Sequence, residues 1–210
     1  KGFVPVRNES MDDARVGALR DGNLAAAFGS NFAGLPITRP ARLPGGRMKL
    51  IDRILALEPG GGRFGIGKIT AEADIRADAW FLSCHFIDDQ VMPGTLMYEC
   101  CLHALRVLVS RMGFVGEAGS FAFEPVPGVA SRLKCRGQVI PSTKKAAYEI
   151  SLKEIGFEAD GTPYFLADAL MYSDGRAVVE MIDMSARLPG LTRSGLEALW
   201  SRRCAEPAQI

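Results

Sequence analysis

Three residues in the stretch WFLSCHFIDDQVMPGTLMYECCLHAL, residues 80–105, could together carry out an elimination reaction. The imidazole of His85 could act as a general base. We expect burial to raise the pKa of an unpaired Glu99, so that its neutral carboxyl group could donate a proton. The backbone N–H of Gly94, at the start of a helix, could hold the oxyanion that forms when a thioester enolises. The chemistry that this trio suits is a β-elimination.

Structural roles for the same residues remain open. A single histidine before a turn and a single glutamate in an apolar helix are more often structural than catalytic. His103 follows Glu99 by four residues, so the two side chains could simply satisfy each other's hydrogen bonds. The candidate ligands for a metal site are Cys84, His85, Glu99, Cys100 and His103. Their order fits no ligand spacing, and we expect no metal.

A buried helix follows the Pro93-Gly94 turn. Thr95 can cap it, and its body, LMYECCLHALRVLVSRM, ends at Gly113. Apolar residues cover most of its circumference, which predicts burial on nearly all sides. The segment that ends at His85, before the turn, is expected to be extended.

Strands are predicted on both sides of this helix. RFGIGKITAE (63–72) alternates as a half-buried strand does, and the glycine run at 60–62 before it is typical of a hairpin loop rather than a phosphate cradle. The later predicted strands span residues 121–126, 131–140, 144–158, 162–173 and 176–188. Asp160-Gly161 and Asp174-Gly175 are hairpin signals. One buried helix with long antiparallel strands predicts an α+β fold, a curved sheet wrapped around the helix.

Length and composition favour one ordinary globular domain. The chain has 210 residues, with 25 Lys and Arg against 24 Asp and Glu, and no basic block that would indicate nucleic-acid binding. We expect a segment or linker over 1–40, with a short helix near ALRDGNLAAAF, the main domain over 41–189 and a tail over 190–210. Five cysteines without a Cys-x-x-Cys pair are typical of reduced thiols. No signal peptide or spanning segment is apparent, and a cytoplasmic protein without membrane insertion is expected.

Three segments carry a resemblance to a known family. LPGGRMKLIDRILALEPGG, ADIRADAWFLSCHFIDDQVMPGTLMYE and LKCRGQVIPSTKKAAYEI occur in the order and spacing of the bacterial 3-hydroxyacyl-ACP dehydratases of the hotdog fold. The likeness is greatest to the β-hydroxydecanoyl-ACP dehydratase/isomerase branch and runs from about Gly17 to Leu188. The CHF, MPG and GQV-P-KK elements together make it specific.

The resemblance implies a single hotdog domain and a site shared between two subunits. It implies that His85 is the base, Glu99 the second catalytic group and Gly94 the oxyanion donor. It also implies a homodimer with a continuous sheet, in which each site takes its histidine from one subunit and its acid from the other. The substrate would be a (3R)-3-hydroxyacyl thioester on the 4′-phosphopantetheine arm of an acyl carrier protein, and the product a trans-2-enoyl thioester. No cofactor is expected.

The chain departs from the dehydratase/isomerase branch at two positions. Glu99 stands where that branch has Asp and resembles the dehydration-only branch, which puts isomerisation in question. His103 replaces a usual glutamine, with an effect on Glu99 that the sequence does not predict. GTLMYECCLHALRVL most resembles dehydratase domains of iterative polyunsaturated fatty acid or glycolipid-type polyketide synthases, which favours a domain cut from a multidomain enzyme.

Two further groups of residues are assigned to binding. Those that could line or gate an acyl tunnel along the helix are Trp80, Phe81, Phe86, Met97 and His103. Those that could meet an acidic carrier protein, although such charges are usually solvated, are Arg132, Lys134, Arg136, Lys144 and Lys145. The rival functions are a hotdog thioesterase, which needs one carboxylate to activate water, and a noncatalytic hotdog that only binds acyl chains or dimerises.

Overall fold

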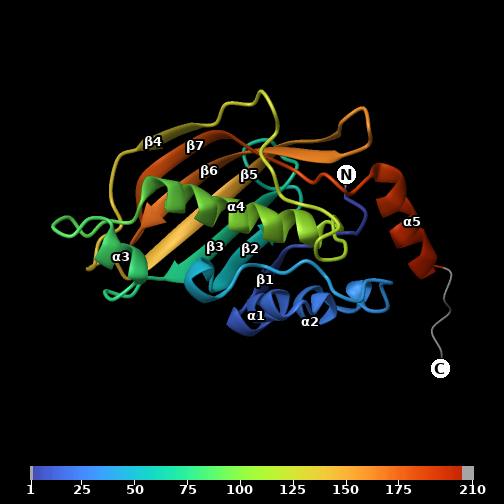
Figure 1. Ribbon diagram of the computed structural model, residues 1–210, viewed down its shortest axis with the longest axis horizontal. Helices are drawn as coiled ribbons and strands as arrows, with labels where there is room; N and C mark the ends of the chain where they lie inside the picture. Colours follow the sequence, from blue (N-terminus) through green and yellow to red (C-terminus); the bar gives the residue numbers. More distant parts are fainter. Residues whose placement is uncertain (1, 205–210) are drawn as a thin grey trace.

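A seven-stranded antiparallel sheet forms the body of the protein. The computed structural model describes residues 2–204, and the side chains as far as residue 201. The strand order is β1-β2-β3-β5-β6-β7-β4. The strands are β1 (Glu9–Met11), β2 (Arg53–Glu58), β3 (Lys68–Asp74), β4 (Arg132–Cys135), β5 (Lys145–Phe157), β6 (Pro163–Ser173) and β7 (Arg176–Arg187). Figure 1 shows the long helix α4 (Gly94–Arg111) lying across this sheet.

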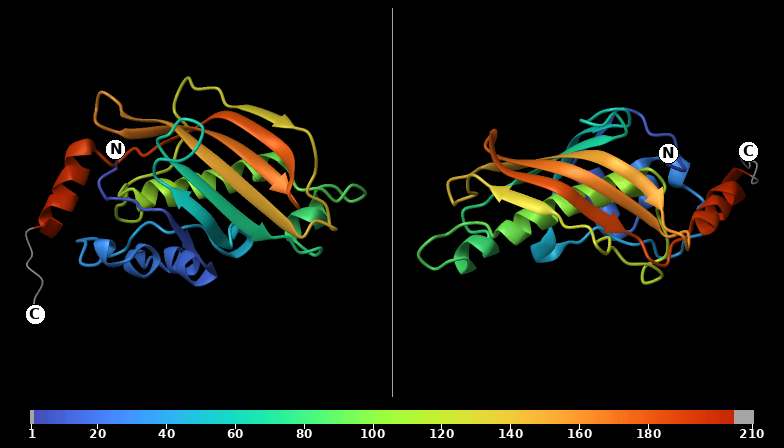
Figure 2. Two further views of the ribbon diagram at one scale, coloured as in Figure 1. Left: turned by 180° about the vertical axis from the view of Figure 1, so that it is seen from behind. Right: turned by 90° about the horizontal axis from the view of Figure 1, so that it is seen from above.

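The apolar circumference of α4 explains its position. The sheet curves around it (Figure 2), and α4 packs against β3, β5, β6 and β7. Alternation along β6 places every second residue from Pro163 to Met171 in the core, as a strand with one covered face requires. The prediction of an α+β hotdog domain with a buried central helix is confirmed.

Both predicted Asp-Gly hairpins form. Asp174 and Gly175 have φ angles of 47° and 82° and make a two-residue turn between β6 and β7. Positive φ at both central residues is the type I′ requirement that Asp-Gly meets at low cost. The Asp160-Gly161 pair lies in the longer loop between β5 and β6, and the glycine run lies in the loop between β2 and β3.

The N-terminal residues add to the sheet and to the core. The helices α1 (Asp13–Asp21) and α2 (Leu24–Phe28) form where one short helix was expected, because Gly22 ends the first at φ 77° and Asn23 caps the second. β1 pairs with β2, and Glu9 binds Nε of Arg111 at 2.6 Å. Two short 3₁₀ turns, η1 (Ser30–Phe32) and η2 (Gly46–Met48), follow.

The helix α5 (Arg193–Cys204) follows β7, in the region expected to be a tail. Leu196 and Trp200 are buried, and Nε1 of Trp200 donates to the Gly113 carbonyl at 2.8 Å. In Figure 1, α5 and the N-terminus lie near the C-terminal end of α4, opposite the small helix α3 (Trp80–Cys84).

Several local predictions were wrong. The strand predicted over 131–140 is confined to β4, Arg132–Cys135. Residues 121–126 make only two isolated bridges, Phe121 to Ala118 and Glu124 to Arg187, and Pro125 lacks the N–H that a strand ladder needs. β3 begins at Lys68, because Gly65 and Gly67 have positive φ angles that break the extended run. Thr95 makes no cap: α4 begins at Gly94, and Pro93 precedes it without a side-chain hydrogen bond.

Candidate active site

His85 is held by a hydrogen bond that fixes its tautomer. It follows α3, so the expected extended segment before it is instead a short helix. Nδ1 of His85 lies 3.0 Å from the carbonyl oxygen of Val91, which can only accept. The proton of the neutral ring therefore belongs on Nδ1, and Nε2 keeps the lone pair that a general base needs. The loop closes back on itself, because the Val91 N–H donates to the carbonyl of His85.

The backbone N–H groups of Gly94 and Thr95 lie at the start of α4. The first hydrogen bonds of α4 are donated by Leu96 and Met97 to the Pro93 carbonyl, so the N–H groups of Gly94 and Thr95 precede the helical ladder. A Cβ added at Gly94 would meet only Sγ of Cys135, at 3.6 Å, which is an ordinary contact. The fold itself therefore does not require glycine here.

Glu99 lies between two basic side chains of its own helix. Its Oε1 is 3.0 Å from Nε2 of His103 and 3.2 Å from a guanidinium nitrogen of Arg106. His103 is 1% exposed, and its contact with Glu99 lacks hydrogen-bond alignment, which leaves Nε2 without another partner among the described residues. The contact with His103 lowers the pKa of Glu99; burial acts in the opposite direction, and the charge of Arg106 lowers the pKa further.

The expectation of a neutral Glu99 was therefore wrong. That expectation assumed an unpaired carboxyl group. In the structure two basic side chains, His103 one turn and Arg106 two turns along the helix, stabilise the carboxylate of Glu99. Sequence reasoning named His103 but missed Arg106. The spacing of Arg106, seven residues after Glu99 on the same helix face, was the signal that could have identified it.

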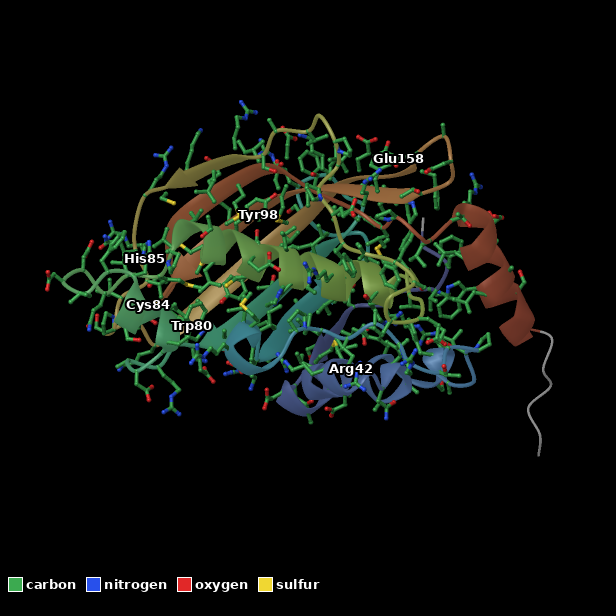
Figure 3. All side chains as sticks on the ribbon, viewed as in Figure 1. Arg42, Trp80, Cys84, His85, Tyr98 and Glu158 are labelled. Atoms are coloured by element: carbon green, nitrogen blue, oxygen red, sulfur yellow. The ribbon has the colours of Figure 1, made fainter. Side chains whose placement is uncertain are left out.

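His85 and Glu99 face different surroundings in the single chain. Glu99 and Arg106 line a pocket of about 230 Å³ between α4, the 123–125 segment and β7, and His85 is not among its lining residues. Figure 3 places His85 at the loop beside α3, whereas Tyr98, the neighbour of Glu99, lies over α4. Cζ of Arg106 packs 4.8 Å from the ring centre of Phe123. The pocket that Glu99 lines is thus formed without His85.

The residues assigned to an acyl tunnel are dispersed. Trp80 and Phe81 line a separate pocket of about 330 Å³, and Trp80 donates to the Arg47 carbonyl at 2.8 Å. Phe86 is 59% exposed and stacks on the His85 ring with centroids 4.1 Å apart. Met97 is in the core.

Three of the five basic residues assigned to carrier docking are in ion pairs. Arg132 pairs with Asp183, Lys134 with Glu180 and Lys145 with Glu72, at 3.9, 3.6 and 2.8 Å respectively. Arg136 and Lys144 are exposed and make no ion pair with a described residue.

Among the side chains that the structure describes, as far as residue 201, no group of three or more His, Cys, Asp or Glu is placed to hold a metal ion. Within residues 2–204, no helix is both long and apolar enough to cross a membrane.

Comparison with known proteins identifies a family. A sequence profile of the FabA-like domain matches residues 43–182. The chain is 34% identical over 159 residues to a subunit of a polyunsaturated fatty acid synthase from Thraustochytrium sp.. The matched region is 76% of this chain but 10% of that relative, so the chain spans about a tenth of the relative's length.

Solved structures give weaker likenesses. A hot-dog-like protein from Thermanaerovibrio acidaminovorans aligns with a TM-score of 0.41 and 7% identity, over 67% of this chain and 92% of the other. A protein described as a monoamine oxidase regulatory protein, from Archaeoglobus fulgius, aligns with a TM-score of 0.41 and 12% identity, over 58% and 87%. Scores of this size add no argument about function.

Proposed function

Because this chain belongs to the family of FabA-like domains, we propose that it removes water from 3-hydroxyacyl thioesters carried by an acyl carrier protein. The product is a trans-2-enoyl thioester for fatty acid or polyketide synthesis. The observation that carries the proposal is the bond between Nδ1 of His85 and the Val91 carbonyl, since it leaves Nε2 free to act as the base. The similarity to part of a polyunsaturated fatty acid synthase supports the carrier-bound substrate.

The proposed reaction balances without a metal or redox cofactor. Nε2 of His85 takes the proton from Cα, and the Gly94 N–H stabilises the negative charge on the thioester oxygen. The Cα–Cβ double bond forms as the Cβ–O bond breaks, and the hydroxyl leaves as water with a proton from the protonated form of Glu99, which returns to the carboxylate that its lowered pKa favours. In reverse, this carboxylate form of Glu99 takes a proton from the attacking water, and protonated His85 returns a proton to Cα.

We further propose that the working site is shared by two copies of the chain. The pocket that Glu99 lines does not include His85, which supports a site completed by a second subunit. Next to His85, Ile87 is 86% exposed and Phe86 is 59% exposed, and such apolar surface favours coverage by a partner. The exposed edge strand β4 offers unpaired backbone groups for a continuous sheet.

The test is hydration of a crotonyl N-acetylcysteamine thioester, followed by mass spectrometry. We expect the unsubstituted protein to add water, and His85→Ala and Glu99→Gln each to lower the rate by about 10²–10⁴-fold, the usual contribution of general acid–base catalysis. Glu197→Gln, on the exposed side of α5, is the matched carboxylate control and keeps full activity. Circular dichroism and gel filtration check the fold and assembly of every variant.

Two results would replace this proposal. Free acid with free thiol would identify a thioesterase, the rival that needs only one carboxylate. A folded protein that binds the carrier but turns over no thioester, with or without His85, would identify a noncatalytic hotdog.

A further inference from the structure

A second depression lies beside the oxyanion donor and takes no part in the proposed chemistry. Its volume is about 710 Å³. We call it the Arg136–Arg176 depression, and its lining residues are Cys135, Arg136, Gly137, Gln138, Ile140, Ser142, Thr143, Ser173, Asp174, Arg176 and Val178. They come from the end of β4, the 136–143 segment and the turn between β6 and β7.

The charge balance of this depression favours an anion. Arg136 and Arg176 are both exposed, and neither forms an ion pair with any described residue. The one lining acid, Asp174, is already satisfied: it accepts from the Lys144 N–H at 3.1 Å and from the Lys145 N–H at 2.8 Å. Two guanidinium groups therefore remain available for a ligand.

Hydroxyl groups complete the polar lining. Thr143 is 4% exposed, and its Oγ1 lies 3.1 Å from Oγ of Ser173 and accepts from the Ile140 N–H at 3.1 Å. This network joins the 140–143 segment to the end of β6 in the wall of the depression. Planar guanidinium donors beside fixed hydroxyls suit the oxygens of a phosphate.

The depression is within reach of Gly94. Its lining residue Cys135 is the side chain nearest to Gly94, with Sγ 3.6 Å from an added Cβ. Cys135 pairs with Val179 of β7. Arg176 lies three residues before Val179 on the same strand, so the Cα atoms of these two residues are roughly 10 Å apart at about 3.3 Å per residue. About a dozen bonds separate the phosphate and the thioester sulfur of phosphopantetheine, equivalent to roughly four extended residues or ~13 Å. The arm is therefore long enough to cover the span along β7 from Val179, which pairs with Cys135 beside Gly94, to Arg176.

We propose that the Arg136–Arg176 depression binds the phosphate of the 4′-phosphopantetheine arm while the thioester lies at Gly94. This inference rests on the proposed function and adds the subsite that positions the arm. It assigns Arg136 to the arm rather than to the carrier surface, and it adds Arg176, which the sequence pattern did not single out.

The experiment compares crotonyl thioesters that differ only in phosphate. Rates of hydration are measured for the thioesters of pantetheine and of 4′-phosphopantetheine, with the unsubstituted protein and with Arg136→Gln/Arg176→Gln. We expect the phosphate to raise kcat/KM about tenfold, mainly through KM, because charge-assisted bonds to the arm act on binding. The double variant loses this advantage. Arg193→Gln on α5, at the other end of the molecule, retains it.

Coenzyme A carries the same arm, so crotonyl-CoA and the carrier-bound thioester are compared as well. Equal losses with both in the double variant support the arm phosphate as ligand. A loss with the carrier alone would mean that the arginines contact the carrier surface, and would overturn the inference. Equal rates with and without the phosphate in the unsubstituted protein would also overturn it.

A binding measurement separates this inference from the proposed function. Calorimetry with 4′-phosphopantetheine, pantetheine and inorganic phosphate needs no turnover. Tighter binding of phosphopantetheine than of the other two, lost in the double variant, supports the subsite even if no thioester is hydrated. Inorganic phosphate that binds as tightly would indicate a general anion site and contradict it.

Discussion

At the scale of single residues, the charge state of Glu99 depends on its neighbours along α4. Burial alone would favour the neutral carboxyl group, but His103 and Arg106 lie within 3.2 Å and favour the carboxylate. His103, which stands where the resemblance leads us to expect glutamine, therefore favours the charged form of Glu99.

This charge state predicts a pH dependence of stability. The folded pKa of Glu99 lies below its ordinary value of 4.5, so the stabilisation is present above that pH and is lost as the pH falls through the folded pKa. We expect Glu99→Gln to lower the free energy of unfolding by about 1 kcal/mol near pH 5.5 and by less near pH 3, as measured by urea denaturation. A difference that stays constant or grows on acidification would contradict this, and Glu197→Gln controls for loss of a surface carboxylate.

At the scale of elements, glycine is favoured in a turn that needs a positive φ angle and disfavoured inside a helix. Gly175 has a φ of 82°, and a Cβ there would meet no other atom within 4 Å, so only backbone strain opposes a side chain. Gly17 lies inside α1, also with open space around it and without a positive φ. The two positions therefore isolate the backbone contribution.

We expect Gly175→Ala to lower the free energy of unfolding by about 1 kcal/mol and Gly17→Ala to raise it by about 0.5–1 kcal/mol. The reasons are the cost of a left-handed alanine and the higher helix propensity of alanine over glycine. Urea denaturation of both variants checks the signs, and the same sign for both would contradict the argument.

The packing of α5 makes a second prediction at this scale. Trp200 stacks edge-on against Phe32, with centroids 5.2 Å apart, and donates to Gly113. We expect Trp200→Ala to cost about 3 kcal/mol, and Trp200→Phe about 1 kcal/mol because it keeps the ring but loses the hydrogen bond. Glu197→Ala, on the exposed side of the same helix, should cost less than about 0.5 kcal/mol in the same denaturation assay.

At the scale of the whole molecule, a shared site predicts complementation between inactive variants. In a mixed dimer of His85→Ala and Glu99→Gln, one site lacks both groups and the other has both. Random reassortment makes about half of the dimers mixed, so about a quarter of full activity should return. The variants are unfolded together, refolded and assayed with the crotonyl thioester. No recovery, although mass spectrometry shows mixed dimers, would place both groups in one chain.

Local patterns in the sequence determined the parts of the fold that short-range physics controls. The apolar circumference of residues 96–112 predicted a buried helix, and the Asp-Gly pairs predicted the hairpins, because burial and turn geometry leave a periodic or dipeptide signal. Residue types and spacing named His85, Gly94 and Glu99, and the resemblance assigned them the same roles. Neither source predicted that the residues before His85 form α3, or that residues 193–204 form a helix that packs on the core.

Only the tertiary structure decided which side chains meet. It placed Trp80 and Phe81 in a pocket apart from the one that Glu99 lines, and it brought Arg136 and Arg176 to one depression. Charge states and shared cavities depend on distances between side chains, including those on elements far apart along the chain. Such distances leave no periodic signal in the sequence, since sheet register and helix placement set them only when the chain folds.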